Sequence, residues 1–212
     1  PQPYRKSTEQ HSFTNSALLS LSPAPVLAWL VTVTSAPSSP PIQPGNSDSH
    51  FMELALQQAR RAPLVGEVPI GAVLVSDNHV IAAAHNYREI SQDPTAHAEI
   101  LIIRKAAEQL KTWRLTDTTL YVTLEPCPMC AGAIVQARIA RLVFGAWDPK
   151  AGACGSILDI PSERRFNHRV QVTGGLREEE SRGLLQEFFR TKRETLSQQR
   201  RRSTSGSQGR AD

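Results

Sequence analysis

Histidine, glutamate and cysteine stand in two short motifs whose spacing suits a metal ion. The first is His-Ala-Glu at 97–99, and the second is Pro-Cys-Pro-Met-Cys at 126–130, about thirty residues later. Cysteines three positions apart at a helix start lie on one face of the helix, so both sulfur atoms can reach one ion. With one histidine they make three protein ligands and leave the fourth tetrahedral position to water, as in catalytic rather than structural zinc sites. The motifs therefore predict a catalytic zinc centre whose ligands are His97, Cys127 and Cys130.

Glu99 is predicted to work beside the metal rather than on it. Successive residues of a helix turn by about 100°, so His97 and Glu99 would point about 200° apart on a regular helix. They can share a site only when that site lies off the N-terminal end of the helix, where the helix dipole also favours thiolates. From there the Glu99 carboxylate can accept a proton from metal-bound water and return it to the substrate and to a leaving amine.

Simpler interpretations of the same residues stay open. A Cys-x-x-Cys pair is also typical of thioredoxin-like redox sites, but such a pair does not explain His97. The pair is also half of a structural zinc site, which needs a fourth ligand from His85 or Cys154. Three cysteines make no disulfide framework, and their pattern is typical of a reducing compartment.

The elements that must position these residues alternate after an opening hairpin. Apolar spacing predicts helices over 48–62, 97–110, 128–138 and 177–197. Strand patterns are predicted over 70–76, 80–84, 119–124, 141–145 and 170–173. Both motifs then begin helices at the carboxyl ends of neighbouring strands, where ligand crevices form. The predicted fold class is α/β, a three-layer α/β/α arrangement with a mixed, mostly five-stranded sheet.

Composition divides the chain into three parts. Residues 1–46 hold eight prolines, eight serines and one acidic residue, which predicts disorder, although a transit peptide or a true start at Met52 would fit as well. A single catalytic domain is predicted over 47–197, followed by a disordered tail over 198–212. No apolar run reaches the roughly twenty residues of a membrane span, so no membrane association is predicted.

The net charge of +4 comes largely from the C-terminal part of the chain. Residues 176–212 carry nine basic and six acidic side chains, whereas 47–175 carry thirteen of each. This excess suits contact with the phosphates of a nucleic acid, and it suits a solvated helix end equally well.

The two motifs together match the established signature of zinc deaminases, and the chain resembles the cytidine and nucleobase deaminase superfamily. Over residues 48–196 it more closely resembles the bacterial tRNA-specific adenosine deaminases. The blocks that carry this closer resemblance lie at 67–73, 85–86, 93–99, 120–133, 144–146, 152–156, 166–170 and 188–190. Phe-Asn-His-Arg-Val at 166–170 and Phe-Phe-Arg at 188–190 separate this family from free-base deaminases more than the zinc motif does.

The resemblance implies a cytidine deaminase-like fold, a homodimer with one zinc ion per subunit, and deamination of the wobble adenosine of a tRNA anticodon, expected in an arginine tRNA, to inosine. It implies that zinc-bound hydroxide attacks C6 while Glu99 carries protons to the purine N1 and to ammonia. It further implies that Asn86 hydrogen-bonds the flipped base and that Val68 lines its pocket. Four more residues are implied to lie near the anticodon loop: Asp148, Lys150, Phe188 and Phe189.

Other functions remain alternatives. The same scaffold also serves deaminases of a free base or nucleotide, such as guanine or cytosine. A zinc-stabilised RNA-binding subunit without activity is a second alternative, and the presence of Glu99 argues against it. Trp147 stands where the family usually has a polar or basic residue. The predicted location is cytoplasmic, or organellar if residues 1–46 are a transit peptide.

Overall fold

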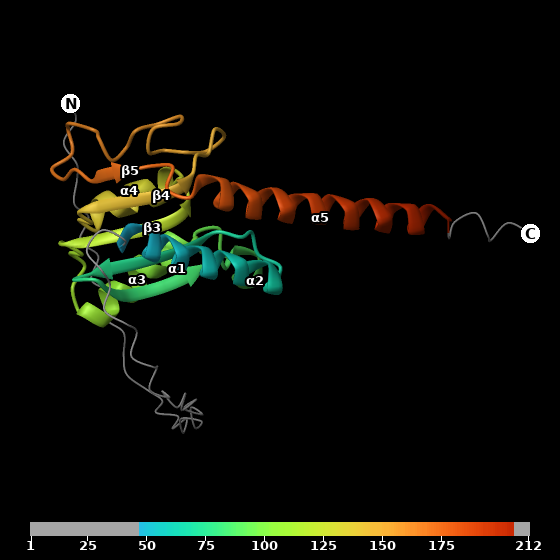
Figure 1. Ribbon diagram of the computed structural model, residues 1–212, viewed down its shortest axis with the longest axis horizontal. Helices are drawn as coiled ribbons and strands as arrows, with labels where there is room; N and C mark the ends of the chain where they lie inside the picture. The colour runs from blue at the N-terminus through green and yellow to red at the C-terminus, as the bar shows by residue number, and fades with distance from the viewer. Residues whose placement is uncertain (1–46, 206–212) are drawn as a thin grey trace, which may run out of the picture. The chain divides into compact units, whose positions relative to one another are not determined.

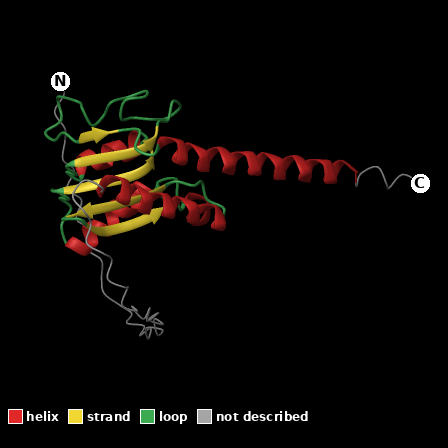
Figure 2. Ribbon diagram, viewed as in Figure 1, coloured by secondary structure: helices red, strands yellow, loops and turns green. Residues whose placement is uncertain are grey.

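A five-stranded mixed sheet forms the centre of the part of the chain that the structure, a computed structural model, describes, which is residues 47–205. The strand order is β2-β1-β3-β4-β5, and Figure 2 shows the strands side by side in yellow. The strands are β1 (Gly71–Ser76), β2 (His79–His85), β3 (Thr118–Leu124), β4 (Arg141–Ala146) and β5 (Gln171–Thr173). The strand β1 pairs antiparallel with β2 and β3, whereas β3, β4 and β5 run parallel. The predicted mixed, five-stranded sheet is confirmed. The prediction of disorder for 1–46 lies outside the described residues.

Helices cover both faces of this sheet, as Figure 1 shows. The helices are α1 (Ser47–Arg61), α2 (Arg88–Ser91), α3 (Ala98–Leu110), α4 (Pro128–Gln136) and α5 (Glu178–Ser205). Because successive strand residues point to opposite faces, β1 contributes to both layers. Ala72 and Leu74 pack in the cluster that contains α3 and α4, whereas Val73 and Val75 pack with α1 and α5. The α/β/α layering predicted from the alternation of elements is confirmed.

Turn chemistry places the ends of the first elements. Asp77 and Asn78 both have positive φ, 47° and 60°, as the tight turn between β1 and β2 requires, and Asp and Asn tolerate that region well. The helix α1 passes at Arg61 into a short 3-10 turn, Ala62–Val65, which ends at Gly66 with φ 83°. The one-turn helix α2 was not predicted, since four residues carry no helical periodicity.

The last helix is longer than the sequence pattern indicates. We expected it to end at residue 197 with a disordered tail over 198–212, but α5 continues to Ser205, while 206–212 lie outside the described residues. The helix end expected at 197 relied on apolar residues alone. Gln and Arg favour helix without packing, and the first helix-breaking residue after 197 is Gly206.

The strands that lead to the two motifs are not neighbours, contrary to the prediction. The strand β1 lies between β2 and β3. Because both pair antiparallel with β1, they run parallel to each other, and their carboxyl ends still lie at one edge of the sheet. The helices α3 and α4 therefore begin at the same edge and pack on the same face. No helix among residues 47–205 is long and apolar enough to cross a membrane.

Candidate active site

His97 and Glu99 lie at the start of α3 with different backbone conformations. His97 is the residue before the first helical turn and is extended, with φ −76° and ψ 150°. Its carbonyl oxygen accepts the Leu101 N–H at 3.0 Å, while Glu99 is already the second helical residue. The backbone of His97 is therefore not helical, and the angle of about 200° between the His97 and Glu99 side chains, expected within a regular helix, does not apply. Both side chains lie near the cysteines of the second motif, His97 beside Cys127 and Cys130 and Glu99 beside Cys130, which fits a site off the end of the helix.

The second motif repeats this arrangement at the start of α4. Cys127 is extended, with φ −71° and ψ 171°, and its carbonyl oxygen accepts the Ala131 N–H at 2.9 Å. Pro128 occupies the first helical position, where its missing N–H costs nothing. Cys130 follows within the first turn and is fully buried.

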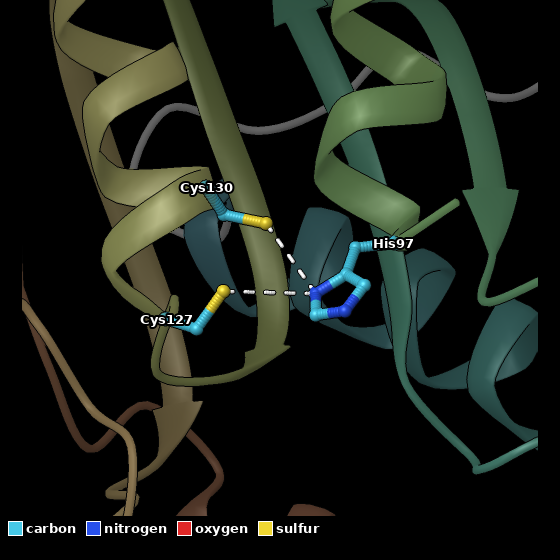
Figure 3. A group of neighbouring side chains, drawn as sticks. All are labelled: His97, Cys127 and Cys130. Carbon is cyan, nitrogen blue, oxygen red and sulfur yellow. Dashed lines mark hydrogen bonds between the residues drawn. The ribbon is translucent and has the colours of Figure 1, made fainter. Parts of the chain in front are cut away.

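The three predicted ligands converge, as Figure 3 shows. His97 Nδ1 lies 3.7 Å from the Cys127 sulfur and 3.5 Å from the Cys130 sulfur. Zinc bonds of about 2.3 Å to sulfur and about 2.05 Å to nitrogen, at a tetrahedral angle, put such atoms about 3.6 Å apart. The ligand atoms of the three residues all lie within 4.8 Å of one another. The geometry and the donor set fit a zinc ion.

No fourth protein ligand joins this group among residues 47–205. His85, one of the two candidates for a structural site, contacts the Asn86 carbonyl oxygen through Nδ1 at 2.7 Å. Cys154, the other candidate, is buried, and its backbone forms an isolated β-bridge with the backbone of Asp159. Three protein ligands leave room for water at the fourth position, which is the arrangement of a catalytic site.

The charges around the three ligands favour a cation. Burial raises the pKa of the Glu99 carboxyl, whose Oε2 has no hydrogen-bond partner among the described residues and whose side chain is only 3% exposed. Contact with the Cys130 thiol lowers the pKa of Cys127 to about 4, whereas that contact together with burial raises the pKa of Cys130. Two thiolates and a carboxylate this close would repel one another, so only Cys127 has a lowered pKa here; a positive ion among them would favour the charged forms of all three groups.

Asn86 and Val68 lie close to the start of α3 and to the first strand. The buried Asn86 side chain accepts the Ala98 N–H through Oδ1 at 3.0 Å, which leaves its amino group as a donor. Val68 is half-buried, and its carbonyl oxygen accepts the Ile70 N–H at 2.8 Å. The hydrogen bond to Ala98 gives Asn86 a structural role at the helix start in addition to the predicted one.

The remaining predicted residues lie on a loop after β4 and on α5. Asp148 Oδ1 accepts the backbone N–H groups of Lys150 at 2.9 Å and of Ala151 at 3.2 Å, so it shapes this loop. Lys150 lines a hollow of about 400 Å³ together with Phe189 and other residues of α5. Phe188 lines a separate hollow of about 340 Å³ together with residues near the end of α1. The two phenylalanines thus lie on different surfaces of α5.

Sequence reasoning missed Glu125, which is buried two residues before Cys127. Its carboxylate accepts hydrogen bonds from the loop after β4. The only signal in the sequence was an acidic residue directly after an apolar strand and before the Pro-Cys pair.

Comparisons with known proteins agree with this geometry. The family model of the MafB19-like deaminases matches residues 46–193. The chain is 53% identical to the tRNA-specific adenosine deaminase of Bacillus subtilis over 143 residues, which cover 68% of this chain and 89% of that protein. It is 54% identical to the protein of the same name from Agrobacterium fabrum over 145 residues, which cover 68% of this chain and 95% of that protein.

Among solved structures, a tRNA deaminase is more similar to this chain than a guanine deaminase is. A structure from a study of A-to-I editing by tRNA:A34 deaminases at the wobble position of transfer RNA matches with a TM-score of 0.63 and 53% identity, over 65% of this chain and 99% of that one. A guanine deaminase from Nitrosomonas europaea matches with a TM-score of 0.55 and 26% identity, over 65% of this chain and 82% of that one. The scaffold is shared, and the sequence is closer to the first of these two structures.

Proposed function

The chain belongs to the MafB19-like deaminases and, among them, to the tRNA-specific adenosine deaminases, and on this premise we propose which residues carry out its conversion of adenosine to inosine in tRNA. The reaction is a hydrolysis, in which the oxygen of water bonds to C6 of adenine, the bond between C6 and the amino nitrogen breaks, and ammonia leaves. One observation carries the assignment of residues: Glu99, a buried carboxylate whose Oε2 has no hydrogen-bond partner among the described residues, lies beside three convergent ligands.

We infer one zinc ion per subunit, held by His97, Cys127 and Cys130. The support is the match of their separations to tetrahedral coordination and the donor set itself, one imidazole nitrogen and two sulfur atoms. A zinc ion held there with one open position would lower the pKa of a bound water molecule to about 7.

Glu99 is the proton carrier in this proposal. Its carboxylate accepts a proton from the attacking water and gives it to N1 of adenine. It then accepts the proton of the new C6 hydroxyl and gives it to the departing amino group, which leaves as ammonia. Burial favours the neutral carboxylic acid and so raises the pKa of Glu99, which is the direction that helps its carboxylate to accept a proton. Because its Oε2 makes no hydrogen bond to the described residues, the atom is free to act on a ligand.

The substrate contacts proposed for this chain lie beside the start of α3, on the loop after β4 and on two surfaces of α5. The Asn86 amino group would donate to the flipped base, and Val68 would line the base pocket. Lys150 and the rings of Phe188 and Phe189 would contact the rest of the anticodon loop, since they line hollows beside α5. The bases of an RNA loop can turn outward without the cost of melting a duplex, which suits this reaction.

A homodimer, an arginine tRNA as substrate and a cytoplasmic location complete the proposal. The first two follow from the family. The third is supported by the tRNA substrate and by three thiols that form no disulfide among the described residues.

Parallel assays on tRNA and on free bases test the proposed substrate. Zinc-loaded protein is incubated with an arginine tRNA whose wobble base is adenosine, and in parallel with guanine, cytosine and free adenosine. We expect inosine at the wobble position and one ammonia per tRNA, with no release from the free bases. The same tRNA with guanosine at the wobble position is the control. Ammonia from guanine but not from tRNA would favour the second candidate, a free-base deaminase, which the likeness to the guanine deaminase structure keeps open.

A further inference from the structure

Glu125 holds a whole loop by its side chain. The residue follows β3, and only 3% of it is exposed. Its carboxylate accepts the backbone N–H of Asp148 at 2.9 Å through one oxygen, and those of Cys154 and Ser156 at 2.9 and 3.0 Å through the other. The Ser156 hydroxyl also donates to it. All of these donors belong to the loop that follows β4, so a single carboxylate joins points eight residues apart on this loop.

The backbone around Glu125 is joined to the same region. The Glu125 N–H donates to the Ala146 carbonyl oxygen at 2.8 Å, and the Ala153 N–H donates to the Pro126 carbonyl oxygen at 2.9 Å. Gly152 approaches so closely that a Cβ atom there would lie 2.2 Å from Glu125 Oε2. The loop therefore wraps tightly around the carboxylate, and position 152 requires glycine for this approach.

This arrangement links two parts of the site that are far apart in the sequence. Glu125 lies two residues before the ligand Cys127, and its own side chain does not belong to the group of metal ligands. The loop that it holds carries Asp148, which in turn accepts the Lys150 N–H, and Lys150 lines the hollow beside α5. The position of Glu125 therefore determines where these two residues stand relative to the metal ligands.

We propose that Glu125 is a positioning residue for RNA binding: its buried carboxylate sets the conformation of the loop over 147–156 and thereby the distance between the zinc ligands and the residues that contact the substrate. The part of this inference that concerns RNA binding rests on the proposed function, whereas the part that concerns the conformation of the loop does not. A catalytic role for Glu125 is not needed, because four donors already occupy its two oxygen atoms. The side chain acts through the loop rather than on the substrate.

The test is the full-length zinc-loaded protein with Glu125→Gln, which keeps the size of the side chain. One oxygen becomes an amino group that faces N–H donors and cannot accept from them, so the loop loses one of its fixed points. We expect faster hydrogen exchange at the backbone amides of Asp148, Cys154 and Ser156, whereas the exchange rates of the β1 amides should not change. The KM for tRNA should rise about tenfold, as one lost buried hydrogen bond predicts, while kcat stays within about threefold and the zinc content is unchanged.

Glu163→Gln is the matched control. The Glu163 carboxylate also accepts a backbone N–H in a loop, that of Arg165 at 3.0 Å, and its hydrogen bonds go to Arg165 rather than to the loop over 147–156. The control should behave like the wild-type protein. Should Glu125→Gln fail to fold, Ser156→Ala removes only the hydroxyl donor and should move loop exchange and KM in the same direction by a smaller amount.

The outcomes separate this proposal from the proposed function. Unchanged exchange of the loop amides overturns the positioning role, whatever the activity, and so does a loss of zinc without a change in the loop. A fall of kcat with KM unchanged also overturns it, because that places Glu125 in the chemical step. If the wild-type protein does not deaminate tRNA, the proposed function fails, while the exchange measurement still decides whether Glu125 holds the loop.

Discussion

Replacement of Glu99 by glutamine should remove activity while leaving the fold and the metal site in place. The amide has the shape of the carboxylic acid but cannot carry a proton. Proton transfer by a positioned side chain contributes about 100-fold to 10,000-fold to a rate, which corresponds to about 3–5 kcal/mol. Because Glu99 would serve both N1 and the departing ammonia, we expect a loss near the upper end of that range.

Although Glu99→Gln should lower activity, it should not lower the stability of the folded protein. The Glu99 side chain is 3% exposed, one of its oxygens has no partner among the described residues, and burial raises its pKa. A buried carboxylate without a partner destabilises the folded state, and a neutral amide avoids most of that penalty. The melting temperature of Glu99→Gln should therefore equal or exceed that of the wild-type protein. Residues that catalysis requires often lower the stability of the folded state in this way.

The assay combines three measurements on the same preparation. Inosine at the wobble position is counted by sequencing the reverse-transcribed tRNA, zinc is measured per chain, and unfolding is followed by calorimetry. Glu108→Gln, an exposed glutamate on the same helix, serves as the control and should match the wild-type protein in all three. Turnover by Glu99→Gln within tenfold of the wild-type rate, with zinc retained, would refute the role given to Glu99.

Four further results are expected. A zinc chelator should abolish turnover and lower the melting temperature, and added zinc should restore both; full activity in metal-free protein would contradict the ligand assignment. Gly145→Ala should lower the free energy of unfolding by about 2 kcal/mol or more, because a Cβ atom there would lie 2.6 Å from a backbone carbonyl oxygen, and urea titration would reveal this loss. Two hydrogen bonds of 2.7 Å from Arg141 lower the pKa of Asp48 from 3.8, so their stabilisation is present above about pH 4 and is lost as the pH falls through the lowered value. Asp48→Asn should cost about 1 kcal/mol at pH 7, since both groups are partly exposed, and it should flatten the dependence of stability on pH between 2 and 5; an unchanged dependence would contradict this. Lys150→Gln should raise the KM for tRNA and reduce its dependence on salt by about one ion, whereas an unchanged salt dependence would remove Lys150 from the RNA surface.

Local chemistry was enough to predict most elements of the fold. Asp77 and Asn78 at positive φ and the residues that alternate along β1 follow from rules that involve only near neighbours in the sequence. The end of α5 at Ser205 was missed because the prediction followed apolar residues alone, whereas the Gln and Arg residues after 197 favour helix by intrinsic propensity. The position of β1 between β2 and β3 was also missed, since the pairing of strands depends on contacts distant in the sequence.

The sequence by itself determined the chemistry of the site. The types of His97, Cys127 and Cys130 and the spacing of the two cysteines specify a zinc ligand set, and Glu99 could serve only off the end of its helix. Tertiary structure alone decided that these groups meet, because two helices that follow separated strands must begin at the same edge of one sheet. It also decided the role of Glu125, since no local rule connects a carboxylate after β3 with amides more than twenty residues away. A motif fixes which atoms are available, but the distances between them are set by packing over the whole domain.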